Sequence, residues 1–367
     1  MTLLPDLMRM MLDAGASDLH LSSNERPQIR KDGDLLVLEG GEKLEPAHVE
    51  AMLEALAPPE KWKEFEKDWD TDFACDVPDL ARYRASYFMD RFGPGAVFRA
   101  IPPTVPTAEQ VGLPRAVMDL CFLTKGLVVI TGPSGCGKTS TMASMIDYIN
   151  DQRKDHVITV EDPIEYRFST KSCLINQREV HRHTESFKRA LRAALREDPD
   201  IVMIGEMRDL ETVEIALETA ETGHLVFGTM TTATAISTVD RIIDQFPPGR
   251  QSQIRTMMSS SLKGIISQAL CKKKTGGRVA AMEILLSSPA VSTSIREAKT
   301  YQISSAMQVG GKAGMRIMSD ALLELVKQKV IDPEEAYIRS GASEELIERL
   351  IPFGFKSPIE APAASSS

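Results

Sequence analysis

The sequence predicts an α/β protein in which a small N-terminal α+β domain precedes a domain built on a mostly parallel sheet. Strands and helices are mixed over residues 1–101, a proline-rich stretch follows at 101–106, and strand and helix patterns alternate from residue 111 onward. Such alternation is typical of a parallel sheet with helices on both faces. The expected domains are an N-terminal domain at 1–101, a linker at 102–113, an α/β domain at 114–289, a helical region at 290–352 and a disordered tail at 353–367.

Length and composition restrict the class of protein. A chain of 367 residues is long for a single hydrophobic core, which favours more than one domain. Hydrophobic residues make up 43% and charged residues 26%, as in ordinary globular proteins. No apolar run approaches the roughly 18 residues needed to cross a bilayer, and no basic region precedes the first apolar residues. We therefore expect a cytoplasmic protein without a signal peptide.

Charge and cysteine content argue against two kinds of site. The net charge of −9 and the 5% aromatic content make nucleic acid an unexpected partner, because such partners need basic patches and stacking side chains. The five cysteines are scattered, with no C-x-x-C pair. That pattern favours a reducing compartment and argues against a structural zinc site or a disulfide framework.

The N-terminal domain is predicted from short periodic segments. An apolar stripe along residues 1–15 indicates an amphipathic helix. Asp32 and Gly33 lie in the middle of 27–38 and supply the positive φ angles that a tight hairpin turn needs. The remaining expected elements are a strand at 17–21, a helix at 46–56, and strands at 70–76, 81–90 and 96–101.

A glycine-rich stretch at 132–139 is the most specific feature of the chain. It fits the pattern G-x-x-x-x-G-K-[ST], follows an apolar, β-branched run at 126–131, and precedes helical apolar spacing at 141–149. A strand, a glycine loop and a helix in this order form a phosphate-binding loop, whose backbone N–H groups point at phosphate oxygens. We therefore expect a nucleoside triphosphate to be bound by Gly132, Pro133, Ser134, Gly135, Cys136, Gly137, Lys138, Thr139 and Ser140.

Two acidic strand ends are candidates for the second half of this site. An apolar strand at 201–204 leads to Glu206, and another at 157–160 leads to Glu161, Asp162 and Glu165. Carboxylates at the carboxyl ends of parallel strands face the ligand crevice, where they can support Mg²⁺ or orient water. A surface ion pair at Glu206 and a solvated charge cluster at 161–165 are the alternatives.

Three histidines carry weaker signals. His224 precedes an apolar strand, and a lone histidine in such a place is usually structural. His181 and His183 have the spacing of a metal-ligand pair, but no third ligand lies near them in the sequence. A metal site is therefore not expected there. Beyond residue 289 the pattern becomes helical, with helices expected at 292–298, 319–329, 333–340 and 342–350.

Taken together, these motifs resemble those of the PilT/secretion-ATPase family of bacterial type IV pilus and type II secretion machines. The likeness covers nearly the whole chain apart from the tail. The absence of a four-cysteine zinc module favours the PilT branch over the assembly and secretion members. The segments that carry the resemblance are 15–21, 161–166, 204–209, 222–226, 240–247 and, more loosely, 314–318.

The resemblance implies a hexameric motor ATPase for pilus retraction, with a PAS-like N-terminal domain and a RecA-like domain around ATP and Mg²⁺. Implied partners are an inner-membrane platform protein of the pilus, through which the cytoplasmic ring would dock, and a paralogous pilus ATPase. Thr139 and Glu206 would hold the metal, and Glu165 would orient water. The implied catalytic set is Glu165, Glu206, Arg84, Arg91, Arg99, His224 and Arg241.

Three departures from the family pattern leave two hypotheses open. Thr231 stands where the family has a second histidine, the segment 290–297 keeps only the ends of a retraction-associated motif, and Cys136 and Thr139 replace two serines. The first hypothesis is an active retraction motor, either principal or accessory. The second is a slow or inactive ATP-binding ring subunit that modulates a partner motor. A nucleic-acid motor is a third, disfavoured by the acidic composition.

Overall fold

The computed structural model describes residues 3–356, so most of the expected tail lies outside it. The chain divides into two compact units. Unit 1 consists of Met1–Val105 together with Pro163–Arg167, and unit 2 of Pro106–Asp162 together with Phe168–Ser367. Between residues 3 and 356, no helix is long and apolar enough to cross a membrane.

Unit 1 contains a six-stranded antiparallel sheet in the order β3-β2-β1-β6-β5-β4, with three helices packed on one face. The expected turn at Asp32 and Gly33 is confirmed, with φ angles of 50° and 95°. The helices are α1 (Leu4–Asp13), α2 (Pro46–Leu56) and α3 (Pro59–Asp68), and the strands are β1 (Asp18–Ser22), β2 (Gln28–Lys31), β3 (Asp34–Val37), β4 (Asp70–Val77), β5 (Ala81–Asp90) and β6 (Gly93–Ile101).

Helix α3 is an element that the sequence analysis did not predict. Its ten residues are mostly charged, and only Phe65 among them is buried. The apolar residues are therefore too few to form the repeating pattern from which a helix is predicted. The ring of Phe65 packs edge-on against the ring of Tyr87 of β5, with 5.8 Å between the two ring centroids. One deeply buried aromatic contact therefore anchors a helix that has almost no sequence pattern.

The two faces of the unit 1 sheet differ sharply. Along β5, Tyr83, Ala85 and Tyr87 are buried under the helices, and the intervening Arg82, Arg84 and Ser86 occupy the other face. This alternation has the period of two expected for a half-buried strand. The polar face of unit 1 therefore carries Arg84 and its register partner Arg99, two of the arginines that the sequence analysis singled out.

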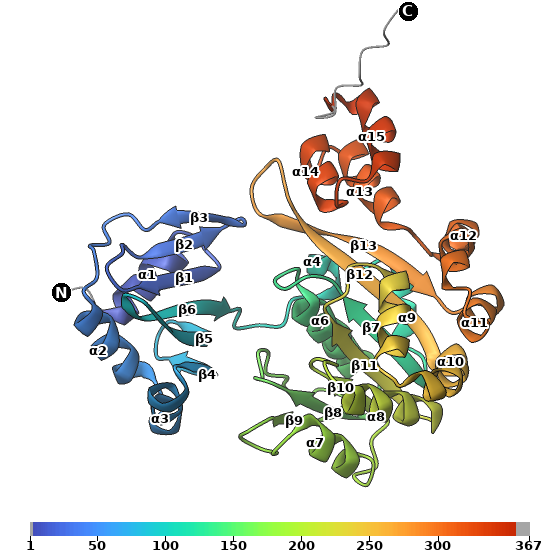
Figure 1. Cartoon of the computed structure of the whole chain (residues 1–367), viewed down its shortest axis with the longest axis horizontal. Helices are drawn as coiled ribbons and strands as arrows, with labels where there is room; N and C mark the ends of the chain where they lie inside the picture. The colour runs from blue at the N-terminus through green and yellow to red at the C-terminus, as the bar shows by residue number, and fades with distance from the viewer. Residues whose placement is uncertain (1–2, 357–367) are drawn as a thin grey trace, which may run out of the picture. The chain divides into compact units, whose positions relative to one another are not determined.

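Unit 2 contains a seven-stranded sheet in the order β13-β12-β7-β11-β10-β8-β9 (Figure 1). All neighbours are parallel except β12 and β13, so the expected mostly parallel sheet is confirmed. The strands are β7 (Gly126–Thr131), β8 (His156–Glu161), β9 (Leu174–Glu179), β10 (Ile201–Ile204), β11 (Leu225–Met230), β12 (Leu262–Lys272) and β13 (Arg278–Leu286).

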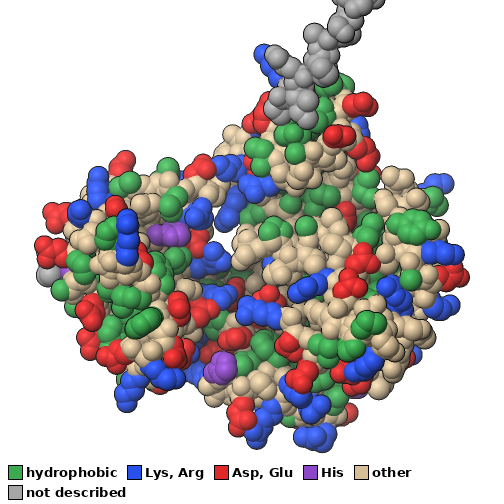
Figure 2. All heavy atoms as spheres, viewed as in Figure 1, with side chains coloured by type: hydrophobic (Ala, Val, Ile, Leu, Met, Phe, Trp, Pro, Cys, Tyr) green, Lys and Arg blue, Asp and Glu red, His purple; other side chains and the backbone are tan. Residues whose placement is uncertain are grey.

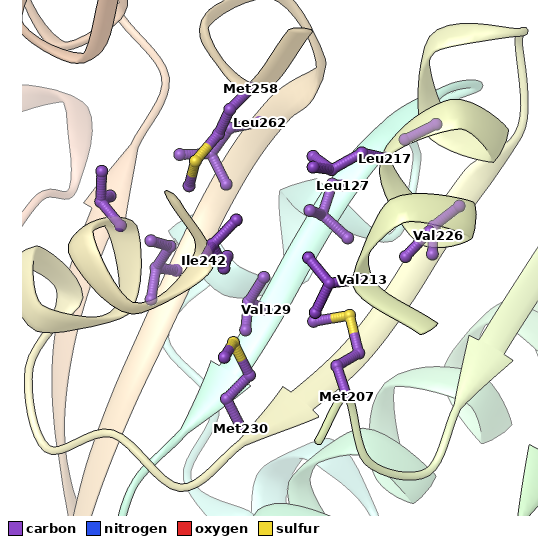
Figure 3. Packing of buried hydrophobic residues seen from close by; sticks show 14 of the residues in the cluster. Leu127, Val129, Met207, Val213, Leu217, Val226, Met230, Ile242, Met258 and Leu262 are labelled. Carbon is purple, nitrogen blue, oxygen red and sulfur yellow. The ribbon is translucent and has the colours of Figure 1, made fainter. Parts of the chain in front are cut away.

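Helices cover both faces of this sheet. One face packs against α6 (Lys138–Gln152) through side chains such as Met142 and Ile146. The other packs against α8, α9 and α10, and Figure 3 shows Leu127 and Val129 of β7 among side chains of these helices. The helices on this face and at its margin are α7 (Phe187–Ala194), α8 (Leu210–Glu221), α9 (Ala235–Asp244), α10 (Pro248–Ser261), α11 (Pro289–Arg296) and α12 (Ile303–Val309).

Two further groups of helices complete unit 2. The second half of the expected linker contains a short helix, α4 (Ala108–Val111), capped by Thr107, and α5 (Arg115–Leu120) follows it. The C-terminal helices pack against Cys271 and Ala281 on the β12–β13 hairpin. They are α13 (Met318–Lys327), α14 (Pro333–Arg339) and α15 (Glu344–Leu350). On the face in Figure 2, acidic and basic side chains are intermixed over the described helices of unit 2.

Candidate nucleotide-binding site

The loop between β7 and α6 has the backbone shape of a phosphate cradle. Gly132, Gly135 and Gly137 have φ angles of 143°, 77° and 92°, a region that other residues rarely adopt. A Cβ atom on Gly132 would lie 2.4 Å from the carbonyl oxygen of Gln268 and 2.6 Å from Sγ of Cys136. The loop can therefore take this course only with glycine at position 132.

Lys138 begins α6, and its side chain lies back across the loop. Its Nζ donates hydrogen bonds to the carbonyl oxygens of Gly132, at 2.8 Å, and Pro133, at 3.1 Å. Pro133, Ser134 and Gly135 are exposed, so the outer part of the loop is open to a ligand. The ammonium group is thus held where phosphate oxygens can take the place of the two carbonyls.

A side chain that the sequence analysis missed supports the loop from below. Gln268 of β12 is 1% exposed, and its Nε2 donates to the carbonyl oxygen of Cys136 at 2.7 Å. Its Oε1 is buried and has no partner among the described residues. No sequence signal identifies Gln268, because it lies 132 residues from Cys136 along the chain. Only the pairing of β12 with β7 brings the two together.

Cys136 is a buried part of the loop wall. Its side chain is 2% exposed, and burial raises the pKa of the thiol, although Lys138 partly opposes this. A raised pKa leaves little thiolate, which is the reactive form of cysteine. Cys136 therefore fills space beneath the loop, and its chemistry is not that of a reactive thiol.

Glu206 lies at the same end of the sheet as the phosphate loop, where the carboxyl ends of the parallel strands meet. It follows β10, whose parallel neighbour β11 pairs with β7 so that Met230 is opposite Thr131. Two strand spacings, about 10 Å, therefore separate the ends of β7 and β10. The Glu206 carboxylate accepts a hydrogen bond from Arg208 at 2.7 Å. Both groups are partly exposed, so a ligand can replace this contact at little cost.

The structure separates the carboxylates that the sequence places together. Glu161 ends β8 in unit 2, where it is 3% exposed and accepts hydrogen bonds from Thr159 and Gln177. Glu165, four residues later, belongs to unit 1, and its carboxylate lies 3.6 Å from the guanidinium of Arg84. Glu165 is therefore held by the polar face of the unit 1 sheet.

Contacts on either side of Glu165 attach this segment to unit 1. The carbonyl oxygen of Ile164 accepts hydrogen bonds from Nε and Nη2 of Arg82, at 3.3 and 3.1 Å. Arg167 contacts Asp76 at 2.8 Å. Arg82 is a site residue that sequence reasoning missed. Arg82 lies two residues before Arg84, and this spacing, which puts both on the same face of β5, could have identified it.

Of the three arginines predicted to act together, only two do lie together. Arg84 of β5 and Arg99 of β6 are register partners, and their side chains contact Asp72 and Asp18 respectively. Arg91 does not lie with this pair. It lies in the β5–β6 turn and stacks on Phe92 at 4.2 Å. Seven residues of strand, about 20 Å, separate it from Arg84.

His224 lies at the end of the sheet where the parallel strands begin, and the phosphate loop lies at the other end, where they finish. It precedes β11, whose six residues run from the register position of Gly126 to that of Thr131. Its Nδ1 lies 3.2 Å from the carbonyl oxygen of Thr219, a local contact at the end of α8. His224 therefore lies about 20 Å from the phosphate loop of its own chain. Its expected catalytic role stays a prediction. Arg241 is exposed on α9.

His181 and His183 line a basic pocket of about 520 Å³ together with Arg178, Arg182 and Arg189. Nδ1 of His183 accepts the backbone N–H of Glu179 at 3.0 Å, which leaves only Nε2 to carry a proton in the neutral ring. The described residues contain no group of three side chains able to hold a metal ion. In that part of the chain, the histidine pair thus lacks the third ligand that a metal site requires.

The order of these motifs matches a known family over most of the chain. The family model for "Type II/IV secretion system protein" matches residues 2–337. The chain belongs to this family. A similar protein is the type IV pilus retraction ATPase PilT of Pseudomonas aeruginosa, 47% identical over 331 residues, which cover 90% of this chain and 96% of that protein. The type IV pilus ATPase PilU of the same organism is 33% identical over 93% of this chain and 89% of its own length.

The fold of this secretion-family protein also matches a solved structure. The crystal structure of the pilus retraction motor PilT with bound ADP has a TM-score of 0.82 and 42% sequence identity, and the match covers 95% of this chain and 100% of that one. The expected fold class is therefore confirmed: an N-terminal PAS-like α+β domain followed by a RecA-like domain with a phosphate loop and C-terminal helices.

Proposed function

We propose that this secretion-family protein is a Mg²⁺-dependent ATPase that works as a homohexamer and powers type IV pilus retraction. The observation that carries the proposal is the phosphate loop. Its glycine geometry and Lys138 are intact, and Glu206 follows β10 at the same end of the sheet. Identity of 47% to a pilus retraction ATPase across nearly all of that protein supports the choice of process.

Each residue has a role that follows from its chemistry. The loop amides and Lys138 would bind the β- and γ-phosphates, and the side chains of Thr139 and Glu206 offer the oxygen ligands that Mg²⁺ prefers. Bound Mg²⁺ would neutralise charge on the phosphate oxygens. Glu165 would orient the attacking water, and Arg84 and Arg99 would stabilise charge on the transferred phosphoryl group.

Partners follow from the same relationship. We propose that the ring docks on the cytoplasmic side of the inner membrane through a pilus platform protein. A paralogous pilus ATPase is a second proposed partner, since PilU of Pseudomonas aeruginosa is 33% identical to this chain. No nucleic-acid partner is proposed, because the chain carries a net charge of −9.

The alternative function is a slow or inactive ATP-binding ring subunit that modulates a partner motor. Thr231 motivates it, because this exposed residue replaces an imidazole with a short hydroxyl side chain beside the end of β11. The altered segment 290–297, most of which forms α11, is the second motive. Intact Lys138 and Glu206 weigh against this alternative.

Hydrolysis by the purified chain distinguishes the two functions. We expect steady-state turnover of Mg-ATP well above that of a Glu206→Ala blank, with Thr231→His changing the rate by less than about tenfold, since one exposed side chain is altered. Phosphate release measured over a range of protein concentrations is the assay. Turnover at the blank level in the wild type, restored by Thr231→His, would instead establish the modulating subunit.

A second prediction concerns the arginines of unit 1. Arg84→Ala is expected to slow hydrolysis by on the order of 10²-fold with little change in nucleotide affinity, because a guanidinium aimed at a phosphoryl group acts mainly in the transition state. Arg91→Ala is the comparison, since Arg91 lies in the β5–β6 turn. Fluorescent-ADP binding and phosphate release are measured for both. A loss of thermal stability in Arg84→Ala without a change in turnover would remove Arg84 from the site.

A further inference from the structure

A chain of hydroxyl groups leads from the phosphate loop into α9. Thr131, the last residue of β7, precedes Gly132, and its Oγ1 lies 2.6 Å from Oγ1 of Thr232. Oγ1 of Thr232 in turn lies 2.7 Å from Oγ1 of Thr238 on α9. Thr131 and Thr238 are fully buried, and Thr232 between them is partly exposed. These hydroxyl contacts therefore connect Thr131, at the start of the phosphate loop, to Thr238 on α9.

A buried carboxylate joins the start of α9 to the start of α13. Oε1 of Glu283 accepts the backbone N–H of Ala235, the first residue of α9, at 2.7 Å. Oε2 accepts the backbone N–H of Met318, the first residue of α13, at 3.2 Å. First-turn amides have no partner within their own helix, and the positive end of each helix favours an anion. The Glu283 side chain thus accepts one first-turn amide from each of two helices.

The sheet places Glu283 close to the loop as well. In the register of unit 2, Thr131 of β7 is opposite Ser267 of β12, and Ser267 is opposite Glu283 of β13. Glu283 is 7% exposed, and burial raises its pKa against the opposing effect of the two amides. A buried carboxylate with both oxygens engaged is held rigidly, because leaving either amide unpaired is costly.

We propose that Glu283 is a positioning residue that couples the nucleotide state of the phosphate loop to the C-terminal helices α13 to α15. When the loop changes its contacts, Thr131 and Thr232 carry the change to α9. Glu283 carries it on to α13, because a single carboxylate fixes both helix starts. The coupling rests on the proposed nucleotide binding by this loop. It makes the C-terminal helices the element of unit 2 that responds to the bound nucleotide.

Glu283→Gln is the variant that tests the connection. A carboxamide has nearly the same shape, but its NH₂ group cannot accept a hydrogen bond, so only one of the two helix starts keeps its acceptor. Glu324→Gln is the matched control, because Glu324 is exposed on α13 and its carboxylate accepts a hydrogen bond from Gln328 of the same helix. Thr232→Val removes the upstream hydroxyl with little change of volume, and it tests the same route if Glu283→Gln does not fold.

The readout is backbone amide exchange in the full chain, with and without Mg-ADP, followed by mass spectrometry for peptides at the starts of α9 and α13. Fluorescent-ADP binding is measured on the same samples. We expect ADP to change exchange at both helix starts in the wild type and in Glu324→Gln. In Glu283→Gln the change at α13 should be lost and that at α9 kept. In Thr232→Val both should be weakened, because Oγ1 of Thr131 keeps its hydrogen bond to the backbone carbonyl oxygen of residue 232 but the link to Thr238 is removed.

The outcomes separate this inference from the proposed function. If ADP does not bind the wild type, the proposed nucleotide site is wrong. If ADP binds but exchange at α13 does not respond, or if the response survives in Glu283→Gln, the coupling role of Glu283 is wrong while the nucleotide site stands. A purely structural role would alter exchange at α13 equally with and without ADP, and that result also overturns the proposal.

Discussion

Lys138→Ala is expected to lower ATP turnover by at least about 10²-fold and to weaken nucleotide binding. The ammonium group lies over the loop, where it donates hydrogen bonds to the carbonyl oxygens of Gly132 and Pro133. It is therefore placed to meet the phosphates in both the ground state and the transition state. Alanine leaves the cradle of amides but removes its one mobile positive charge.

Binding and turnover are both needed to interpret this variant. Fluorescent-ADP titration gives the affinity, and phosphate release under Mg-ATP gives the rate. Lys154→Ala is the matched control, since Lys154 is exposed just beyond the end of α6. The melting temperature should change little, because Lys138 is only partly buried and its contacts are to two carbonyls at the loop surface. Wild-type turnover in Lys138→Ala would show that this loop is not the catalytic site.

Glu206→Gln is expected to abolish turnover while keeping nucleotide bound. The carboxylate follows β10 at the edge of the sheet where the phosphate loop lies, and its partner Arg208 is exposed. The amide keeps the shape and removes the charge that would support Mg²⁺. Loss of several kcal/mol of transition-state stabilisation corresponds to a rate reduced by about 10²- to 10³-fold.

The contrast with Lys138→Ala is the informative result. We expect Glu206→Gln to bind fluorescent ADP as the wild type does and to hold ATP without releasing phosphate. Glu211→Gln on α8 is the control, because Glu211 is exposed and pairs with Lys188 at the surface. If Glu206→Gln hydrolyses ATP normally, another carboxylate must support the metal, and buried Glu161 at the end of β8 is then the candidate to test.

The phosphate loop could be predicted because its features are local in sequence. The β-branched run before Gly132, the glycines and the helical spacing after Lys138 lie within 24 consecutive residues, and β7 has the expected bounds of Gly126–Thr131. Helix α2 was likewise predicted with its observed bounds, Pro46–Leu56. Local periodicity and backbone chemistry suffice for such elements, because their geometry depends little on distant residues.

Distances between the predicted site residues could not be obtained from the sequence. Arg91 directly follows β5 and His224 directly precedes β11, but the length of a strand separates Arg91 from Arg84 and His224 from the phosphate loop of its own chain. Glu165 is close to Glu161 in sequence and belongs to the other compact unit. Sequence spacing gives neighbours along the chain, whereas a sheet edge gathers residues from several strands.

The sequence by itself determined the α/β fold class, the phosphate loop with Lys138, and the acidic strand ends, because each depends on patterns within one or two neighbouring elements. The tertiary structure decided which residues support them. Gln268 meets Cys136, and Glu283 meets both Ala235 and Met318, only because β12 and β13 join the sheet beside β7. Those contacts satisfy buried polar groups from distant segments, and no local pattern records them.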